Sequence, residues 1–331
     1  MTRTSLQLPL LCLAGCAGLR VNLVQASVQK PSQVAVFFSV MSPDGTPVPG
    51  LTAKQFNIYE DDKLVSPFES KQTILNPDVA VMQYTLLLLD MSGSVTESGG
   101  LQPLQWPIDD FTRKVSQHQQ IAVYAFDGRP DIVRLSGFTT SPHVSLASFR
   151  AKDPSTNLNG AIVKALEVLE AQLAHWPAQL AMGTLVVFTD GTDHAARVAH
   201  ADLMQAIDKA DVSVLVIGVG NEIDESELSA IGRDGSYLSK DPAATEKAFG
   251  EIAARIDAYA KSFYLLSYCS PARAGEHELR IEPVTPEGTS GSLSYRFSAA
   301  GFGPDCNPTR KPSFDVHRAK LRLSTAGEGG W

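Results

Sequence analysis

The sequence has no excess of positive charge, few cysteines and no long apolar run beyond its first residues, and each shortage argues against a class of protein. Its 331 residues include 28 Lys and Arg against 36 Asp and Glu, a net charge of −8. An acidic surface does not favour binding to nucleic acid or to an anionic membrane. No apolar stretch beyond the N-terminal region approaches the ~20 residues that cross a bilayer. The four cysteines include no CxxC pair, so a zinc site is not expected.

The first residues have the profile of an export signal. Residues 1–16, MTRTSLQLPLLCLAGC, carry one arginine, a short apolar stretch and small residues before Cys16. The last four of them, LAGC, resemble the lipoprotein box of bacteria, which implies cleavage before Cys16 and acylation of its thiol. We therefore expect a lipid anchor in the bacterial cell envelope, and Ala17 after the cysteine favours the outer membrane on the same resemblance. A short buried helix with an incidental cysteine is the alternative.

Export bears on the two cysteines that remain. Cys12 is lost with the signal and Cys16 takes the lipid, which leaves Cys269 and Cys306 as a pair in an oxidising compartment. We expect a disulfide between them, and two separate buried thiols are the alternative.

Two segments rich in short strands and turns flank a different kind of sequence. Residues 30–78 contain VAVFFSVM, FNIYE and LVSPFESKQTI, separated by turns of Gly, Pro and Asp. Residues 263–306 repeat the pattern with FYLLSYCS, HELRIEP and SLSYRFSA. We expect a small β-sandwich built from both flanks, followed by a tail at 307–331.

Between the flanks, at 80–262, apolar strands alternate with helical patterns, which predicts an α/β domain with a doubly wound, mostly parallel sheet. The expected strands are YTLLLL, IAVYAF, DIVRL, TLVVF and SVLVIGV. A first helix is expected to begin near Pro107, a favoured first helical position, and a last one to cover 243–261.

Five polar residues are expected to meet at one edge of this sheet. In open α/β sheets, ligands bind beyond the carboxyl ends of strands where the strand order reverses. Carboxylate and hydroxyl oxygens suit Mg²⁺, with Mn²⁺ or Ca²⁺ as alternatives, and two carboxylates leave the ion electrophilic towards an incoming acid. The five residues lie after YTLLLL, in the loop PSTNLNG and at the end of TLVVFTD: Asp90, Ser92, Ser94, Thr156 and Asp190.

The stretches DMSGS, STNL, FTDG and VIGVG, in this order, resemble the von Willebrand factor type A domain and its metal-ion-dependent adhesion site. The resemblance implies that Ser92, Ser94 and Thr156 contact the metal, and that Asp90 and Asp190 bind it directly or through water. It also implies a protein ligand that offers an acidic residue. The flanking segments resemble those of bacterial lipoproteins in which this domain is embedded. VTESGG after Ser94 lacks the paired acids of the neighbouring regulatory metal site in integrins, so one ion is expected.

The sequence thus predicts a binding protein for metal-dependent adhesion or complex assembly, and not an enzyme. One alternative is a scaffold whose ion only stabilises the fold. Another is a Mg²⁺-dependent phosphohydrolase that uses the aspartate of DGTDH, but neither Asp90 nor Asp190 has the second aspartate two residues on.

Two other patterns have simpler explanations. Any one of the five polar residues, taken alone, would be interpreted as a helix cap. GVGNE at 218–222 lacks the third glycine of a dinucleotide fingerprint, so no nucleotide is expected.

Overall fold

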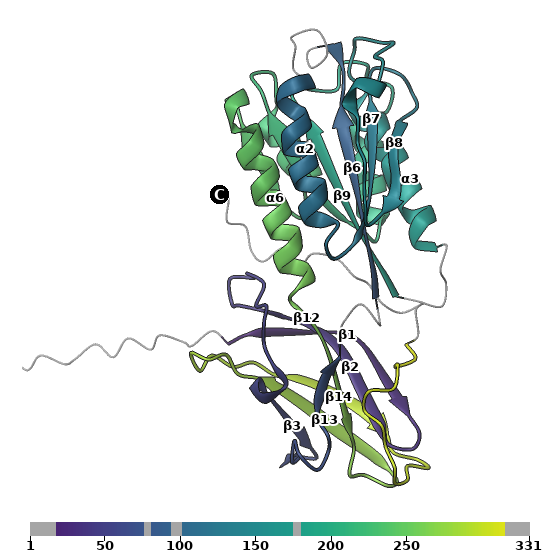
Figure 1. Ribbon diagram of the computed structural model, residues 1–331, viewed down its shortest axis with the longest axis vertical. Helices are drawn as coiled ribbons and strands as arrows, with labels where there is room; N and C mark the ends of the chain where they lie inside the picture. The colour runs from purple at the N-terminus through teal and green to yellow at the C-terminus, as the bar shows by residue number, and fades with distance from the viewer. Residues whose placement is uncertain (1–17, 76–80, 94–100, 175–179, 315–331) are drawn as a thin grey trace, which may run out of the picture.

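The computed structural model describes residues 18–75, 81–93, 101–174 and 180–314. These residues form an α/β domain and a β-sandwich, which lie one above the other along the longest axis of the molecule (Figure 1). The chain starts in the sandwich, builds the α/β domain and returns to the sandwich.

The α/β domain is built on a six-stranded sheet in the order β11-β10-β9-β6-β7-β8. All neighbouring strands are parallel except β7 and β8, which are antiparallel. This confirms the doubly wound, mostly parallel sheet. The central strands are buried along nearly their whole length, because helices cover both faces of the sheet. The strands are β6 (Val81–Asp90), β7 (Gln120–Phe126), β8 (Val133–Thr139), β9 (Leu180–Thr189), β10 (Ser213–Val219) and β11 (Ser236–Ser239).

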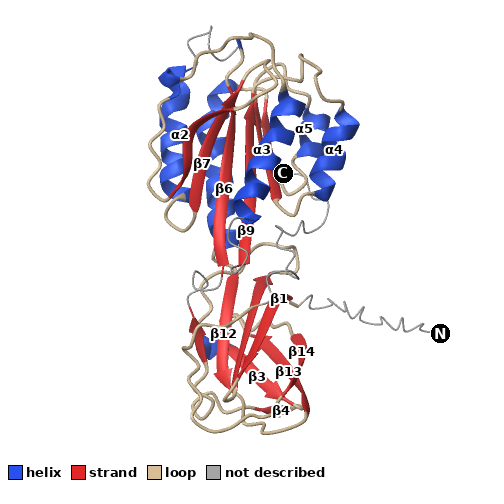
Figure 2. Ribbon diagram, turned by 90° about the vertical axis from the view of Figure 1, so that its right-hand side faces the viewer, coloured by secondary structure: helices blue, strands red, loops and turns tan. Residues whose placement is uncertain are grey.

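Of the helices in the described residues, two cover one face of this sheet and three cover the other (Figures 1 and 2). On the first face lie α2 (Leu101–Val115) and α6 (Thr245–Ala260). On the second lie α3 (Leu158–Ala174), α4 (His200–Lys209) and α5 (Glu225–Ile231). A 3₁₀ turn, η3 (Leu146–Ser148), precedes α3, and η4 (Pro242–Ala244) precedes α6. In η4 the Asp241 side chain accepts a hydrogen bond from the Ala243 N–H at 3.0 Å, as expected of a cap.

Helix α2 corrects one prediction from the sequence. It begins at Leu101 and contains Pro107 in its interior, so the expected start near Pro107 was wrong. Proline removes one backbone hydrogen bond inside a helix, but Leu104 and Ile108 on either side of it are both buried against the sheet, and this burial offsets the loss. The helix buries Ile108, Phe111 and Val115 against the sheet.

The β-sandwich consists of two four-stranded antiparallel sheets that share one apolar core. The first sheet has the order β1-β2-β12-β5 and the second β14-β13-β3-β4, so each draws strands from both flanks, which confirms the predicted architecture. The strands are β1 (Arg20–Gln29), β2 (Gln33–Met41), β3 (Phe56–Glu60), β4 (Lys63–Leu64), β5 (Thr73–Leu75), β12 (Phe263–Cys269), β13 (Glu276–Pro283) and β14 (Leu293–Ser298), with the 3₁₀ turn η1 (Ala53–Gln55) before β3.

Strand β1 and the segment LVSPFESKQTI differ from expectation. Strand β1 starts at Arg20, before the segment in which strands were predicted. LVSPFESKQTI is strand only near its ends, and a turn at 67–71 separates β4 from β5.

Aromatic rings join the α/β domain to the sandwich. Helix α6 leads directly into β12, and the Tyr259 and Phe263 rings meet edge to face with centroids 4.9 Å apart. Phe263 in turn stacks on Phe37 of β2, with centroids 5.4 Å apart. One apolar cluster therefore runs from the helix-covered sheet into the sandwich.

A disulfide joins the end of β12 to the segment after β14. Cys269 and Cys306 are bonded, with Cα atoms 5.7 Å apart, which confirms the predicted pair. Among the described residues, no helix combines the length and the apolar character needed to cross a membrane.

Candidate metal centre

Asp90, the last residue of β6, is a carboxylate that is completely buried. Its Oδ2 accepts a hydrogen bond from the Thr189 hydroxyl at 2.7 Å, and its Oδ1 accepts one from the Ser92 N–H at 3.0 Å. The pKa of Asp90 is raised to about 6. Burial is the main cause of the rise, the Thr189 hydroxyl opposes it, and the negative charge of Asp190 adds to it. Asp90 forms no ion pair with any described Lys, Arg or His. A bound cation would stabilise the charged form of such a buried, unpaired carboxylate.

Main-chain hydrogen bonds join the three loops that carry the predicted site residues. The Gly93 N–H, in the loop after β6, donates to the Pro154 carbonyl at 3.0 Å, in the loop before α3. The Ala195 N–H, in the loop after β9, donates to the Thr156 carbonyl at 2.9 Å. Ser92 and Thr156 are both buried where these loops meet. The structure therefore brings Asp90, Ser92 and Thr156 to one edge of the sheet.

Gly93 allows two of these loops to approach closely. A Cβ atom at this position would lie 3.1 Å from the Pro154 carbonyl oxygen and 3.2 Å from its Cβ. A larger residue would push the Pro154 loop, and Thr156 with it, away from Ser92.

Asp190 follows β9, the neighbour of β6 in the sheet, and is only partly buried. Gly220, in the loop after β10, lies directly against it. A Cβ on Gly220 would be 2.7 Å from the Asp190 carbonyl oxygen, and the backbone there has φ +154°. The loop after β10 is the fourth loop at the site. Glycine at position 220 lets this fourth loop approach without displacing Asp190.

Sequence reasoning missed three residues that organise the site: Thr189, Gly220 and Asp127. Asp127 follows β7 and is fully buried. Burial raises its pKa, but hydrogen bonds from Arg129 and from the Lys152 N–H bring the pKa below the ordinary value. Its carbonyl accepts the Asn157 N–H at 3.2 Å and so fixes the loop that presents Thr156. The signal for Asp127 was present in the sequence, since it follows an apolar strand just as Asp90 does.

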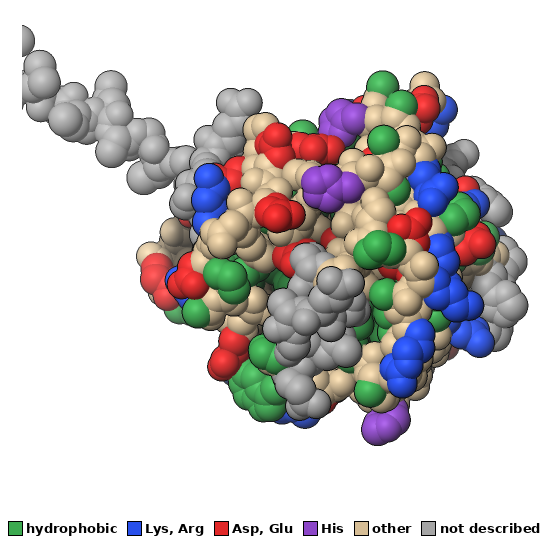
Figure 3. Space-filling view, turned by 90° about the horizontal axis from the view of Figure 1, so that it is seen from above, with side chains coloured by type: hydrophobic (Ala, Val, Ile, Leu, Met, Phe, Trp, Pro, Cys, Tyr) green, Lys and Arg blue, Asp and Glu red, His purple; other side chains and the backbone are tan. Residues whose placement is uncertain are grey.

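The rim of the site carries charges of both signs (Figure 3). Arg197 donates to the Gly128 carbonyl at 2.6 Å and lies 3.2 Å from the Asp153 carboxylate. On another side His200 lies 3.3 Å from Glu227, which joins α4 to α5. The surface around the site is therefore of mixed charge.

The residues present fit a hard cation. No group of three or more His, Cys, Asp or Glu side chains is placed to hold a metal within the described part of the chain. The available oxygen ligands are the Asp90 and Asp190 carboxylates and the Ser92 and Thr156 hydroxyls, a set suited to Mg²⁺, Mn²⁺ or Ca²⁺. Two other predicted residues, Ser94 and Cys16, lie outside the described residues.

The sequence profile of the von Willebrand factor type A domain matches residues 86–252, half of the chain. The chain belongs to this family. The matched range contains all five predicted metal ligands. Domains of this family are commonly metal-dependent protein-interaction modules.

Several solved structures are similar to this chain. A von Willebrand factor type A protein from Catenulispora acidiphila has 11% identity and a TM-score of 0.45, over 88% of this chain and 75% of that one. The manganese-loaded TRAP protein of Plasmodium vivax has 12% identity and a TM-score of 0.44, over 75% and 100%. Proximal thread matrix protein 1 from the mussel byssus has 16% identity and a TM-score of 0.41, over 60% of this chain and 51% of that one, about half its length. No curated protein sequence matches the chain.

Proposed function

We propose that this protein is a metal-dependent binding module of the bacterial envelope, which grips an acidic side chain of a protein partner through Mg²⁺. The ion would be held by Asp90, Ser92, Ser94, Thr156 and Asp190. The observation that carries this proposal is the fully buried Asp90 carboxylate. It lies close enough to Asp190 for the second charge to raise its pKa, and it forms no ion pair with a described Lys, Arg or His. A lipid on Cys16 would attach the protein to the membrane, and a partner in the same envelope would be within reach.

Each residue of the site has a distinct part in this proposal. Asp90 supplies a negative charge whose orientation the Thr189 hydroxyl fixes. Ser92 and Thr156 supply hydroxyl oxygens from two loops that are tied together by the Gly93–Pro154 hydrogen bond. Asp190 is the more exposed of the two carboxylates and would be the one nearer to an approaching partner. The two carboxylates carry a total charge of −2, which equals but does not exceed the +2 charge of the ion. The ion therefore keeps its affinity for a third carboxylate.

The first test is binding of the ion itself. Isothermal titration with MgCl₂ would compare the wild-type protein with Asp90→Asn, which keeps the size of the side chain, and with Asp131→Asn as the control. Asp131 is an exposed aspartate of the same domain, between β7 and β8. Loss of the buried charge should weaken Mg²⁺ binding by at least about a hundredfold, since a charged ligand contributes several kcal/mol. Equal affinity of Asp90→Asn and wild type would refute the site.

The second test is partner capture. The wild-type protein is used as bait on envelope extracts in Mg²⁺ and eluted with EDTA, with Asp90→Asn as the matched negative. A partner released by EDTA and absent from the Asp90→Asn bait supports the proposal. A partner retained equally in EDTA would instead favour a scaffold. Melting with and without Mg²⁺ separates the two functions further, since an ion that serves only stability raises the melting temperature strongly before any partner is added.

A further inference from the structure

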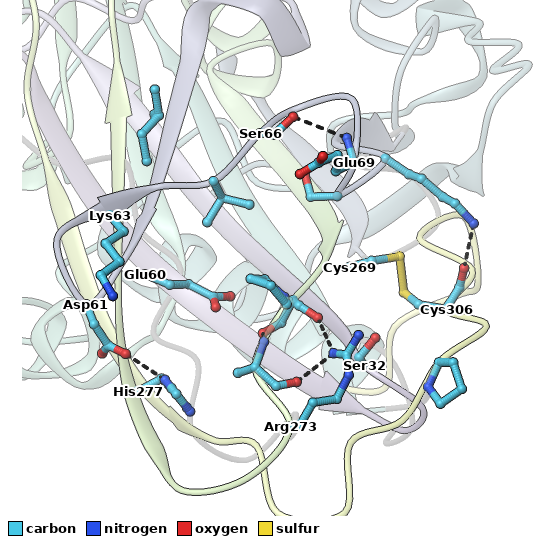
Figure 4. A pocket seen from close by; sticks show the side chains of 18 of the residues that line it. Ser32, Glu60, Asp61, Lys63, Ser66, Glu69, Cys269, Arg273, His277 and Cys306 are labelled. Atoms are coloured by element: carbon cyan, nitrogen blue, oxygen red, sulfur yellow. Dashed lines mark hydrogen bonds and ion pairs between the residues drawn. A yellow bond between two sulfur atoms is a disulfide. The ribbon is translucent and has the colours of Figure 1, made fainter.

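A large cavity lies at the opposite end of the molecule from the metal centre, at the far tip of the sandwich. Strand β12 begins at Phe263, next to the α/β domain, and ends at Cys269 in the wall of this cavity. The cavity has a volume of about 640 Å³, within the range of sites that bind small molecules or side chains. Figure 4 shows its lining, which comes from the β3–β4 hairpin, the turn before β5, the end of β12 and the segment that carries Cys306.

Glu60 places a buried carboxylate in this cavity. The residue ends β3 and is only 6% exposed, and Figure 4 shows its carboxylate in the middle of the lining side chains. Its Oε1 accepts a hydrogen bond from the Tyr268 hydroxyl at 2.7 Å. Burial raises the pKa of Tyr268, and so does the negative charge of Glu60, so the phenol stays protonated and remains a donor. The second oxygen of Glu60 has no hydrogen-bond partner among the described residues.

Three cationic side chains in the wall make their hydrogen bonds to groups other than Glu60. Arg273 donates to the carbonyls of Ser270 at 3.0 Å and Ala272 at 2.7 Å. Lys71 donates to the Cys306 carbonyl at 3.3 Å. His277 lies 2.7 Å from the Asp61 carboxylate and 2.9 Å from the Ala274 carbonyl.

Lys63 faces Glu60 across the β3–β4 hairpin but does not come within ion-pair distance of it. A carboxylate that is nine-tenths buried therefore opens into the cavity with no described cationic side chain within ion-pair distance of it. Its charge adds the smallest part to the raised pKa of His277, which comes first from the Ala274 carbonyl and then from Asp61. Burying a charge in this way costs free energy that a bound cation would offset.

The remaining wall suits an apolar stem behind a cationic head. Val65, Pro271, Ala272, Pro304 and the Cys269–Cys306 disulfide contribute apolar surface to the lining. Glu69 adds a second carboxylate that forms no ion pair with a described residue, and Figure 4 shows it across the cavity from Arg273. In the same turn as Glu69, Phe68 is 92% exposed. Phe68 is not one of the lining residues, but it directly precedes Glu69, which is. An exposed aromatic side chain in the same turn as a pocket residue is available for contact with a protein partner.

From these observations we propose that the cavity binds an alkylammonium or guanidinium group on an apolar stem, with Glu60 as its anionic partner. The group is either a free amine or the side chain of a lysine or arginine in a protein partner. This site is separate from the metal centre and needs no metal ion.

The test is a titration in EDTA, which removes any contribution of the metal centre. The probes are a short peptide with one central lysine between leucines, the same peptide with norleucine in place of the lysine, and free pentylamine. The lysine peptide should bind at least about tenfold more tightly than the norleucine peptide, because only the lysine peptide pairs with a buried carboxylate. Equal binding of the two peptides, or no binding of either cationic probe, would overturn the proposal.

Three variants locate the site. Glu60→Gln keeps the side-chain volume and an acceptor for Tyr268, and should weaken lysine-peptide binding by at least about tenfold. Glu69→Gln changes an exposed side chain and should therefore fold normally, so it can test the site even if Glu60→Gln does not fold. It should weaken binding about threefold. Glu287→Gln removes an exposed carboxylate of the sandwich outside the cavity and should leave binding unchanged. Unchanged binding in a folded Glu60→Gln, or in Glu69→Gln if Glu60→Gln is unfolded, contradicts the proposal.

A fourth variant separates the two sources of the cation. Phe68→Ala removes the exposed aromatic ring of the turn that carries Glu69. If the lysine of a protein partner is the natural ligand, the peptide should bind more tightly than pentylamine, and Phe68→Ala should weaken the peptide alone. Equal binding of both probes in both proteins supports a free amine.

Discussion

The Thr189 hydroxyl donates a 2.7 Å hydrogen bond to the buried carboxylate of Asp90 and so joins the carboxyl ends of two neighbouring strands, β9 and β6. Thr189 directly precedes Asp190 in the chain. One strand end therefore supplies both the donor that orients the first carboxylate and the second carboxylate itself. The geometry of the proposed metal centre thus depends on the pairing of the two strands as much as on its ligands.

Replacing Thr189 by valine should weaken Mg²⁺ binding by about tenfold or more. Valine keeps the shape of the side chain but removes the hydroxyl, and a hydrogen bond to a charged group is worth about 1.5–3 kcal/mol. The same hydrogen bond lowers the pKa of Asp90, so its loss also favours the protonated form, which does not bind metal. Isothermal titration with MgCl₂ measures the effect.

Thr85→Val is the matched control for this experiment. Thr85 lies in the middle of β6, five residues before Asp90, is equally buried and donates to the Gln119 side chain at 2.6 Å. Its replacement should lower the melting temperature but leave Mg²⁺ affinity unchanged. If both variants lost affinity equally, the Thr189 contact would have no specific role in the site.

The pKa of Asp90 predicts how stability depends on pH. Its rise from the ordinary aspartate value of 3.8 to about 6 in the fold means that the folded state favours the neutral carboxyl group. This contribution to stability is fully present below about pH 4 and is lost as the pH rises through about 6, by about 3 kcal/mol in total. Urea unfolding in EDTA should therefore show the wild type losing stability relative to Asp90→Asn over this window.

Saturating Mg²⁺ should remove that relative loss, because the ion favours the ionised carboxylate. Conversely, Mg²⁺ affinity should fall as the pH drops below about 6, where a proton competes with the ion. Parallel stability curves for wild type and Asp90→Asn in EDTA would show that Asp90 does not titrate in this range.

Gly220→Ala should damage the metal centre without touching a ligand side chain. The new Cβ would lie 2.7 Å from the Asp190 carbonyl oxygen at a backbone φ of +154°, so the loop or Asp190 must move. We expect a loss of about 1–3 kcal/mol in the free energy of unfolding, together with weaker Mg²⁺ binding.

Gly250→Ala provides the contrast. Gly250 lies inside α6, and a Cβ there would meet no other atom within 4 Å. Alanine should stabilise the helix by about 0.5–1 kcal/mol and leave the ion affinity unchanged. Melting curves and Mg²⁺ titrations of both variants check the pair, and normal Mg²⁺ affinity in Gly220→Ala would show that the fourth loop does not position Asp190.

The elements that were predicted from the sequence are those with a strong local pattern. LLLL of β6 and SVLVIGV of β10 are continuous apolar runs because both faces of these strands are buried. Strand β1 was missed because it is an edge strand whose mostly part-exposed residues show no clear alternation. Helix α5 was missed because seven residues, 225–231, are too few for a clear helical period.

The same distinction applies to the metal centre. Asp90, Ser92, Thr156 and Asp190 could be predicted because each stands beside a recognisable strand end or helix start. The contributions of Thr189 and Gly220 could not, because they arise from contacts between loops that are distant in sequence. That Thr189 meets Asp90 depends on β9 pairing with β6 in the register Leu89 to Phe188. Both strands are buried on both faces, so they lack the alternation of apolar and polar residues that would fix this register.

The disulfide should stabilise the sandwich without affecting the metal centre. Cys269 and Cys306 are 37 residues apart in sequence, and closing a loop of this length is worth about 4 kcal/mol through the entropy of the unfolded chain. The double variant Cys269→Ser with Cys306→Ser should therefore melt at a lower temperature, and reduction of the wild type with dithiothreitol should reproduce the shift. Its Mg²⁺ affinity should equal that of the wild type, because the bond lies at the tip of the sandwich and the ion site at the other end of the α/β domain. A fall in Mg²⁺ affinity in the folded double variant would show instead that strain passes between the two ends through the aromatic contacts of Tyr259, Phe263 and Phe37.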